Sequence, residues 1–234
     1  MMEQQAPQTV KPMELDALPG GHQSVHQALP QALIDCLRRA PRVLLIANNP
    51  AITQADFDQL AIGADDVVVS FNTCVKAPLL SAQSVNLFVH GFNAPDAYFF
   101  GLPPGPDVQR LIGQGGRCFT LLVGATGAMC PMPGVALFWE RIPLPPLWHY
   151  PVDRPGGKRF VGPSTGFNAL VLLDWLRGQG DYNYQLMTLG FSNEAGKLWS
   201  GHAWDYERQW LLQSDVITIP LLPRPWWQRW FRPR

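Results

Sequence analysis

The sequence predicts a single α/β domain built around a mostly parallel, twisted β-sheet. Short apolar runs of strand length recur along the chain. The run at residues 43–47 is apolar at every position, as buried strands of a parallel sheet are. Segments with apolar residues at helical spacing separate these runs, and such alternation is typical of a Rossmann-like arrangement. The expected strands are residues 43–47, 66–70, 86–89, 119–123, 185–189 and 216–221, and the expected helices are residues 25–40, 53–60, 167–177 and 203–212.

The composition indicates a folded domain of ordinary size. Of the 234 residues, 47% are hydrophobic and 15% are charged, which is enough apolar material for a core and excludes general disorder. The 18 basic residues balance the 18 acidic ones, so no overall positive field attracts a nucleic acid, and we expect no nucleic-acid partner. The four Cys residues form no CxxC pair, which argues against a zinc site.

Three segments flank or interrupt the expected domain, which spans residues 24–222. Residues 1–23 are polar and lack the apolar run of a signal peptide, so we expect a flexible arm. Residues 131–159 are rich in Pro, which disfavours regular ladders, and we expect an irregular lid there. Residues 223–234 form an aromatic and basic tail. No apolar run is long enough to span a membrane, so a cytoplasmic location is expected.

Polar and small residues follow the expected strands, where parallel sheets bind their ligands. Asn48 and Asn49 follow the first strand, Asn72 follows the second, and Gly190 and Phe191 follow the fifth. Asn side chains at such an edge can hydrogen-bond the phosphate, ribose or base of a nucleotide. The alternative for the Asn pair is a simple Asx turn without a ligand.

The segment GPSTG, residues 162–166, stands directly before an apolar helix. Ser164 and Thr165 would offer hydroxyl and N–H groups at the helix N-terminus, and Gly166 would allow close approach, which together suit a phosphate. The same letters match the G-x-S-x-G turn of serine hydrolases, with Ser164 as nucleophile. Pro163 directly before the Ser and the lack of an HGG-like oxyanion loop argue against that assignment. A plain helix cap is the remaining alternative.

His202 and Glu207 have H-x-x-x-x-E spacing at the start of the last expected helix. An imidazole can take a proton from a sugar hydroxyl near neutral pH. Glu207 lies just over one helical turn farther on, where it either orients His202 or supports the fold of the segment. A lone His is more often a surface or core side chain.

Two weaker matches predict no further chemistry. Asp56-Phe57-Asp58 has the DxD letters of metal-using glycosyltransferases, but it falls within an expected helix, so we expect no metal there. The run GATG, residues 124–127, is an incomplete dinucleotide fingerprint and is expected to be a turn.

In this order, the motifs resemble those of the CMP-sialic acid-dependent sialyltransferases over about residues 43–223. VLLIANNPAI is similar to the first nucleotide-binding loop of the bacterial lipooligosaccharide enzymes, although both glycines of that loop are absent. VVVSFN is similar to the next strand of that family. GPSTGFNAL resembles the sialylmotif that contacts CMP. LMTLGFSN followed by GHAWDYE resembles the later strand and the H-x-x-x-x-E motif of the general base.

The resemblance implies a sialyltransferase-like variant of the GT-A fold and an inverting, metal-independent transfer of a 2-keto sugar acid. The donor would be a CMP-sugar and the acceptor a glycan or lipid-linked glycan, without a further cofactor. His202 would be the general base, with Glu207 beside it, and Tyr150 would assist the departing phosphate. Arg154, Lys158 and Arg159 are alternative cationic partners for that phosphate. The implied nucleotide-binding residues are Asn48, Asn49, Asn72, Ser164, Thr165, Gly166, Gly190 and Phe191.

The tail and the rival functions complete the expectations. Trp and Arg alternate within residues 223–234, which favours peripheral contact with the inner face of a membrane carrying anionic lipid. Packing of the tail on protein is the alternative. Three rival functions remain: a transferase using CMP-Kdo, a serine hydrolase with Ser164 as nucleophile, and a non-catalytic nucleotide-binding protein.

Overall fold

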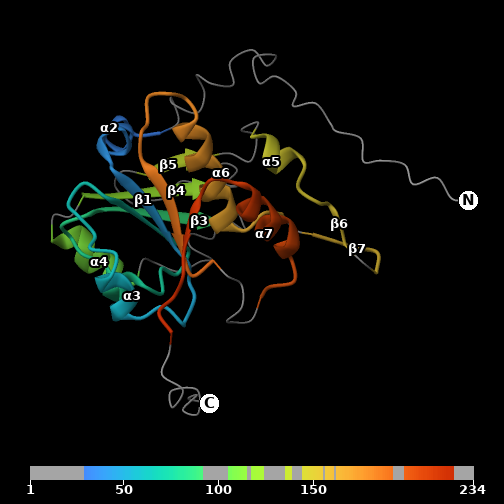
Figure 1. Ribbon diagram of the computed structural model, residues 1–234, viewed down its shortest axis with the longest axis horizontal. Coiled ribbons are helices and arrows are strands. Elements are labelled where there is room, and N and C mark those ends of the chain that lie inside the picture. The colour runs from blue at the N-terminus through green and yellow to red at the C-terminus, as the bar shows by residue number, and fades with distance from the viewer. Residues whose placement is uncertain are drawn as a thin grey trace, which may run out of the picture.

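The computed structural model describes residues 29–91, 105–114, 117–123, 135–138, 144–154, 156–160, 162–191 and 198–223. Within them, one sheet contains β1 (Arg42–Ile46), β2 (Val67–Phe71), β3 (Val85–Gly91), β4 (Arg117–Val123), β5 (Val135–Phe138), β8 (Gln185–Leu189) and β9 (Ile217–Ile219). The strand order is β5-β4-β3-β2-β1-β8-β9, and every pairing is parallel (Figure 1). The protein is therefore a Rossmann-like α/β domain, as predicted.

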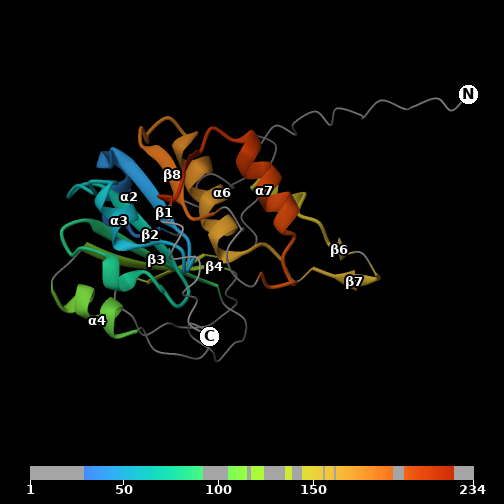
Figure 2. The same cartoon turned by 60° about the horizontal axis from the view of Figure 1, so that its bottom comes forward.

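Helices cover both faces of the sheet. Successive residues of a strand point to opposite faces, so that Val43 and Leu45 belong to one core and Leu44 and Ile46 to the other. The first core lies under α2 (Gln31–Arg39) and α6 (Thr165–Arg177), with α7 (Trp204–Gln213) packed against α6; the second lies under α3 (Gln54–Asp58), the 3₁₀ helix η2 (Ala77–Leu79) and α4 (Pro106–Gly113). Figures 1 and 2 show α6 and α7 on the opposite side of the sheet from α3 and α4.

The direction of strand addition reverses beside β1. The chain adds strands outward from β1 to β5 and then returns to place β8 against the other edge of β1. Crossover segments diverge at such a point and leave room for a ligand beyond the carboxyl ends of the strands. The β1–β8 boundary is thus the position at which the fold favours a site.

The segment expected to be an irregular lid, residues 131–159, is more regular than predicted. Its start supplies β5, which extends the sheet by pairing with β4. The later part contains the short helix α5 (Pro145–Trp148) and β6 (Asp153–Arg154), which pairs antiparallel with β7 (Lys158–Arg159). The prediction of irregular structure was wrong here because the Pro residues flank the four-residue β5 and leave its own main chain free to pair.

Element ends also differ from the expectations. Helix α2 begins at Gln31, because Pro30 adopts an extended ψ of 132° and a proline disfavours the helical conformation of the residue before it. The expected N-terminal arm, the GATG turn and the tail beyond residue 223 lie outside the described residues. No helix within the described ranges has the length and apolar character needed to cross a membrane.

Candidate functional site

The two Asn residues after β1 hold the strand ends together. The Asn49 amide donates to the carbonyl of Gly190 at 3.0 Å and accepts from the N–H of Ala51 at 2.9 Å. The Asn48 amide donates to the carbonyl of Phe71 at 2.8 Å and accepts from the N–H of Val75 at 3.1 Å. The Asn49 contact with Ala51 is the Asx turn that the sequence left open. Both side chains therefore bridge β1 to its neighbours, and their amides are engaged by main chain.

The end of β8 is packed against the start of α6. Gly190 has a φ of +78°, and a Cβ there would lie 2.7 Å from Cδ1 of Ile52, so that glycine is required. The ring of the next residue, Phe191, lies so close to Gly166 that a Cβ on that glycine would be 3.3 Å from it. Phe191 also packs edge-on against Phe71 at the end of β2. These contacts place the first turn of α6 over the strand ends.

The first turn of α6 provides donors beside Asn72. Ser164 is the N-cap, and its Oγ accepts from the N–H of Phe167 at 3.1 Å. Thr165 Oγ1 lies 3.2 Å from Nδ2 and 3.3 Å from Oδ1 of Asn72, which joins the end of β2 to the helix. The N–H groups of Thr165 and Gly166 stand in the first turn, where the helix itself supplies no acceptor. They form the donor set expected of an anion site.

Glu207 lies buried against the same helix end. Its Oε1 accepts from the N–H of Ser164 and from the hydroxyl of Tyr150, both at 2.8 Å, and its Oε2 accepts from the hydroxyl of Ser164 at 2.6 Å. The N–H of Ala203 donates to the Tyr150 oxygen at 2.6 Å. Burial raises the pKa of Glu207 above its ordinary value, although the two hydrogen bonds from Ser164 and the one from Tyr150 oppose the shift. Burial also raises the pKa of Tyr150 far above its usual range.

His202 is fixed beside the same segment. Its Nδ1 lies 2.7 Å from the carbonyl oxygen of Gly162. A carbonyl only accepts, so Nδ1 carries the proton and Nε2 of the neutral ring is the basic atom. Trp199 and Trp204 pack edge-on around the imidazole, with ring centroids at 4.6 and 5.1 Å. The arrangement fixes both the tautomer and the orientation of a group able to accept a proton.

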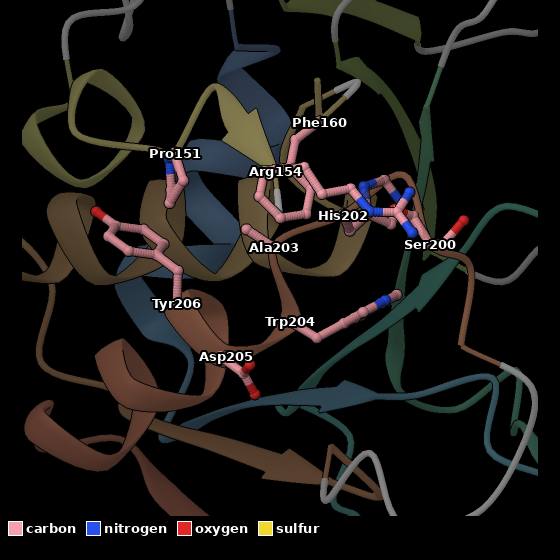
Figure 3. Close-up of a pocket in the computed structure, with 9 residues that line it drawn as sticks. All are labelled: Pro151, Arg154, Phe160, Ser200, His202, Ala203, Trp204, Asp205 and Tyr206. Atoms are coloured by element: carbon pink, nitrogen blue, oxygen red, sulfur yellow. The ribbon is translucent and has the colours of Figure 1, made fainter. Parts of the chain in front are cut away.

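The imidazole opens on a pocket of about 330 Å³. The pocket lies between the β6–β7 segment and the start of α7, and Figure 3 shows the side chains around it. Arg154 lies there and donates to the carbonyl of Ser200 at 2.9 Å. The lining residues are Pro151, Arg154, Phe160, Ser200, His202, Ala203, Trp204, Asp205 and Tyr206.

The structure divides the predicted residues into two connected groups. The strand ends bring together Asn72, Thr165, Gly166, Gly190 and Phe191. The side-chain amides of Asn48 and Asn49 bond main-chain carbonyls at the same strand ends. His202, Glu207, Tyr150 and Ser164 gather on the other side of the GPSTG segment through the bonds described above. Glu207 bonds Ser164 and Tyr150, and the carbonyl of Gly162 fixes His202. Of the two roles expected for Glu207, the observed hydrogen bonds are those of a support for the fold.

Several participants were not anticipated. The sequence did not indicate the Gly162 carbonyl, because a main-chain acceptor has no signature in residue type. Trp199 and Trp204 flank SGHA in the sequence, and this pair of aromatic residues around a His was the available signal.

Asp56, the first residue of the DxD letters, has a structural role. Asp56 accepts from the N–H of Thr53 at 2.7 Å, which closes the first turn of α3, and from the N–H of Leu222 at 2.8 Å. Among the described residues, no group of three or more His, Cys, Asp or Glu side chains is placed to hold a metal ion.

Compared with protein-family models, with curated proteins and with solved structures, the chain shows no significant match. The geometry of the site therefore carries the functional argument.

Proposed function

We propose that this protein is an inverting, metal-independent glycosyltransferase. It would transfer a 2-keto sugar acid, such as sialic acid, from a CMP-activated donor to a hydroxyl of a glycan or lipid-linked glycan. The observation that carries the proposal is the position of His202: its Nδ1 is held at 2.7 Å by the GPSTG segment that also begins α6, and its ring lines a pocket. The GPSTG segment thus holds the proposed base, His202, at one end and begins the helix proposed to bind the phosphate at the other.

The donor phosphate is assigned to the first turn of α6. Ser164 already donates its N–H and its hydroxyl to Glu207, so we assign the phosphate to the N–H groups of Thr165 and Gly166, for which the helix itself supplies no acceptor. The positive end of the helix favours an anion there. As the bond between the anomeric carbon and CMP breaks, negative charge grows on the phosphate, and these fixed donors stabilise it without reorganising.

The acceptor hydroxyl gives its proton to His202. Attack of the hydroxyl oxygen on the anomeric carbon forms the new glycosidic bond while the bond to CMP breaks, and Nε2 receives the proton. A single displacement of this kind inverts the anomeric carbon.

Ligand specificity tests the donor assignment. Thermal unfolding would be measured with CMP, CDP, UDP, GDP and NAD. A selective increase in melting temperature with CMP supports the proposal, and a response to UDP, GDP or NAD without CMP contradicts it. Turnover with CMP-sialic acid and CMP-Kdo then identifies the sugar. Labelling of Ser164 by a fluorophosphonate would instead support a serine hydrolase, a function not favoured by a hydroxyl that donates to a carboxylate.

Replacing His202 tests the general base. We expect His202→Ala to lower turnover by about 10²–10⁴-fold, because the acceptor hydroxyl loses its proton acceptor, and to leave CMP binding intact. His149→Ala is the matched control, since that side chain is exposed, and its turnover should equal that of the wild type. Undiminished turnover of His202→Ala refutes the base assignment.

The tail would bring the enzyme to a lipid-linked acceptor. Within residues 223–234, aromatic residues suit the membrane interface and Arg residues suit anionic lipid. The full chain should sediment with vesicles that contain anionic lipid, and a protein lacking residues 223–234 should stay in the supernatant. Equal sedimentation of both forms contradicts this peripheral contact on the inner membrane face.

A further inference from the structure

The hairpin formed by β6 and β7 projects from the domain beyond α7 (Figures 1 and 2). Its register places Arg154 directly opposite Lys158, so both cations stand on the same face of the two strands. Like charges directly opposite each other destabilise a strand pair, and an isolated two-stranded hairpin is marginally stable at best. An anionic partner over this face would remove the repulsion.

The basic residues of the hairpin are not neutralised by the protein itself. Lys158 and Arg159 are exposed, and neither forms an ion pair within the part of the chain that the structure describes. Arg154 donates to a main-chain carbonyl, which carries no charge. Residues 151–160 hold these three basic residues and one acidic residue, Asp153, although the whole chain has no net charge. The hairpin is therefore a local positive surface, which attracts anions.

Exposed apolar side chains accompany these cations. Val152, just before β6, is 57% exposed, and Leu198 and Trp199 are 40% and 54% exposed. The guanidinium of Arg154 donates to the carbonyl of Ser200 at 2.9 Å, which holds the second pair beside the hairpin. Indole and aliphatic side chains among basic residues are typical of a protein surface that meets an anionic membrane.

We propose that this hairpin surface binds the anionic headgroups of a lipid bilayer. It consists of Val152, Arg154, Lys158, Arg159, Leu198 and Trp199. A specific protein interface takes about 20–30 residues from each side, many more than these six. A bilayer suits a small surface with unpaired, flexible cations, because it presents many anionic groups in no fixed geometry.

The proposal goes beyond the proposed function and depends neither on a CMP donor nor on the C-terminal tail. The N–H of Leu222, just before the tail, donates to Asp56 on α3, which covers the other face of the sheet from α6 and α7. The hairpin also contributes Arg154 and Phe160 to the pocket beside His202 (Figure 3). A bilayer bound at the hairpin would therefore lie near that pocket.

Hydrogen exchange of the full chain, measured by mass spectrometry, locates the contact. The probes are vesicles of phosphatidylglycerol and phosphatidylcholine in equal parts, with vesicles of phosphatidylcholine alone for comparison. We expect the anionic vesicles to slow exchange at β7 and at residues 198–203, and to leave α4 unchanged. Added salt should reverse the effect, because it screens exposed charges.

Reversing one charge tests the electrostatic part. Lys158→Glu puts opposite charges across the hairpin, which favours its fold, and should weaken binding to the anionic vesicles by about fivefold or more. Arg110→Glu on α4 makes the same change in net charge at a side chain that is 40% exposed, and it is the matched control. It should bind as the wild type does.

A second pair of variants tests the apolar part. Trp199→Ser should also weaken vesicle binding, because an indole favours the headgroup level of a bilayer. Leu212→Ser, on α7 at a residue that is 79% exposed, is its control and should leave binding unchanged.

The outcomes separate the hairpin surface from the tail and from the proposed function. Exchange slowed only within residues 223–234, or equal effects of Lys158→Glu and Arg110→Glu, overturns the hairpin surface. Slowed exchange at β7 with polyglutamate, and none with anionic vesicles, overturns the lipid assignment and indicates an acidic protein partner. Slowed exchange at β7 with anionic vesicles supports this surface even where CMP gives no selective thermal response, a result that contradicts the CMP-dependent function alone.

Discussion

Single residues with unusual backbone angles shape the strand ends of the site. Asn72 and Cys74 have φ values of 49° and 47°, in the left-handed region that costs energy for residues other than Gly. Asn72 is also the residue that meets Thr165 at the start of α6. The turn after β2 thus places Asn72, which tolerates this backbone conformation better than most residues, against the proposed phosphate site.

Gly190 offers a test at this scale. Gly190→Ala would place a methyl group 2.7 Å from Ile52 and force a positive φ on Ala, so we expect a loss of about 3 kcal/mol in the free energy of unfolding. Gly180→Ala is the matched control, because Gly180 has a φ of +81° but no atom within 4 Å of the added Cβ. It should lose only about 1 kcal/mol. Urea unfolding measures both, and equal losses would show that the contact with Ile52 is unimportant.

At the scale of elements, one carboxylate joins α7 to the start of α6 and to the segment after α5. Glu207 receives hydrogen bonds from Ser164 and Tyr150, and Tyr150 in turn accepts from Ala203 at the start of α7. The rings of Tyr150, Phe167, Tyr206 and Trp210 pack around this connection. The position of His202, two residues before α7, therefore depends on how α7 is attached to α6.

Removing this carboxylate should loosen both helices. Glu207→Ala leaves the N–H of Ser164 and the hydroxyl of Tyr150 without their partner, and we expect a loss of about 2–4 kcal/mol in unfolding free energy. Glu207→Gln keeps an acceptor for both groups and should lose less. Urea unfolding compares the two variants. If they were equally destabilised, the hydrogen bonds would not be what holds α7 in place.

At the scale of the whole molecule, the amino and carboxyl ends of the strands have different roles. At the start of the strands, the Arg42 guanidinium on β1 pairs with the buried Asp66 carboxylate just before β2 and donates to the carbonyls of Leu60 and Ala61. At the opposite edge lie the amides, the helix N-terminus and the imidazole of the proposed site. This stabilising charge pair is thus separated from the strand ends that carry the proposed site.

A buried His at the end of β3 should make the molecule sensitive to acid. Burial lowers the pKa of His90 to about 3, although a hydrogen bond with the Asn72 main chain opposes the shift. The neutral ring therefore contributes its full stability above the unfolded pKa of about 6.5. That contribution is lost as the pH falls from there toward 3, by at most about 1.4 kcal/mol per pH unit.

Unfolding measured from pH 7 to pH 4 checks this prediction. His90→Gln lacks the titration, so its stability should fall less steeply with acid than that of the wild type, even if it is lower at neutral pH. Parallel curves for the two proteins would show that His90 is not the group responsible.

Local patterns in the chain were enough to predict the layered fold. VLLI and VVVS are apolar over nearly their whole length, and QLMTL is apolar at three of its five positions. They form β1, β2 and β8 within a residue of the predicted ends. The apolar run after GPSTG forms α6, capped by Ser164. Strand β5 was missed because the prolines on both sides of its four apolar residues argue against a ladder in this segment. Its pairing partner, β4, is what makes it a strand.

In the candidate site, too, some features could be predicted from the sequence and others depended on the folded structure. Residue types and order identified Asn72, Thr165, Gly166 and His202 as residues to examine, because strand ends and helix starts can be read from local periodicity. The hydrogen bond of His202 to Gly162, the engagement of Asn48 and Asn49 by main chain, and the bonding of Glu207 to Ser164 followed only from the folded arrangement. Each joins segments between 23 and 141 positions apart. Periodicity acts over a few residues, whereas such contacts depend on how the helices pack on the sheet.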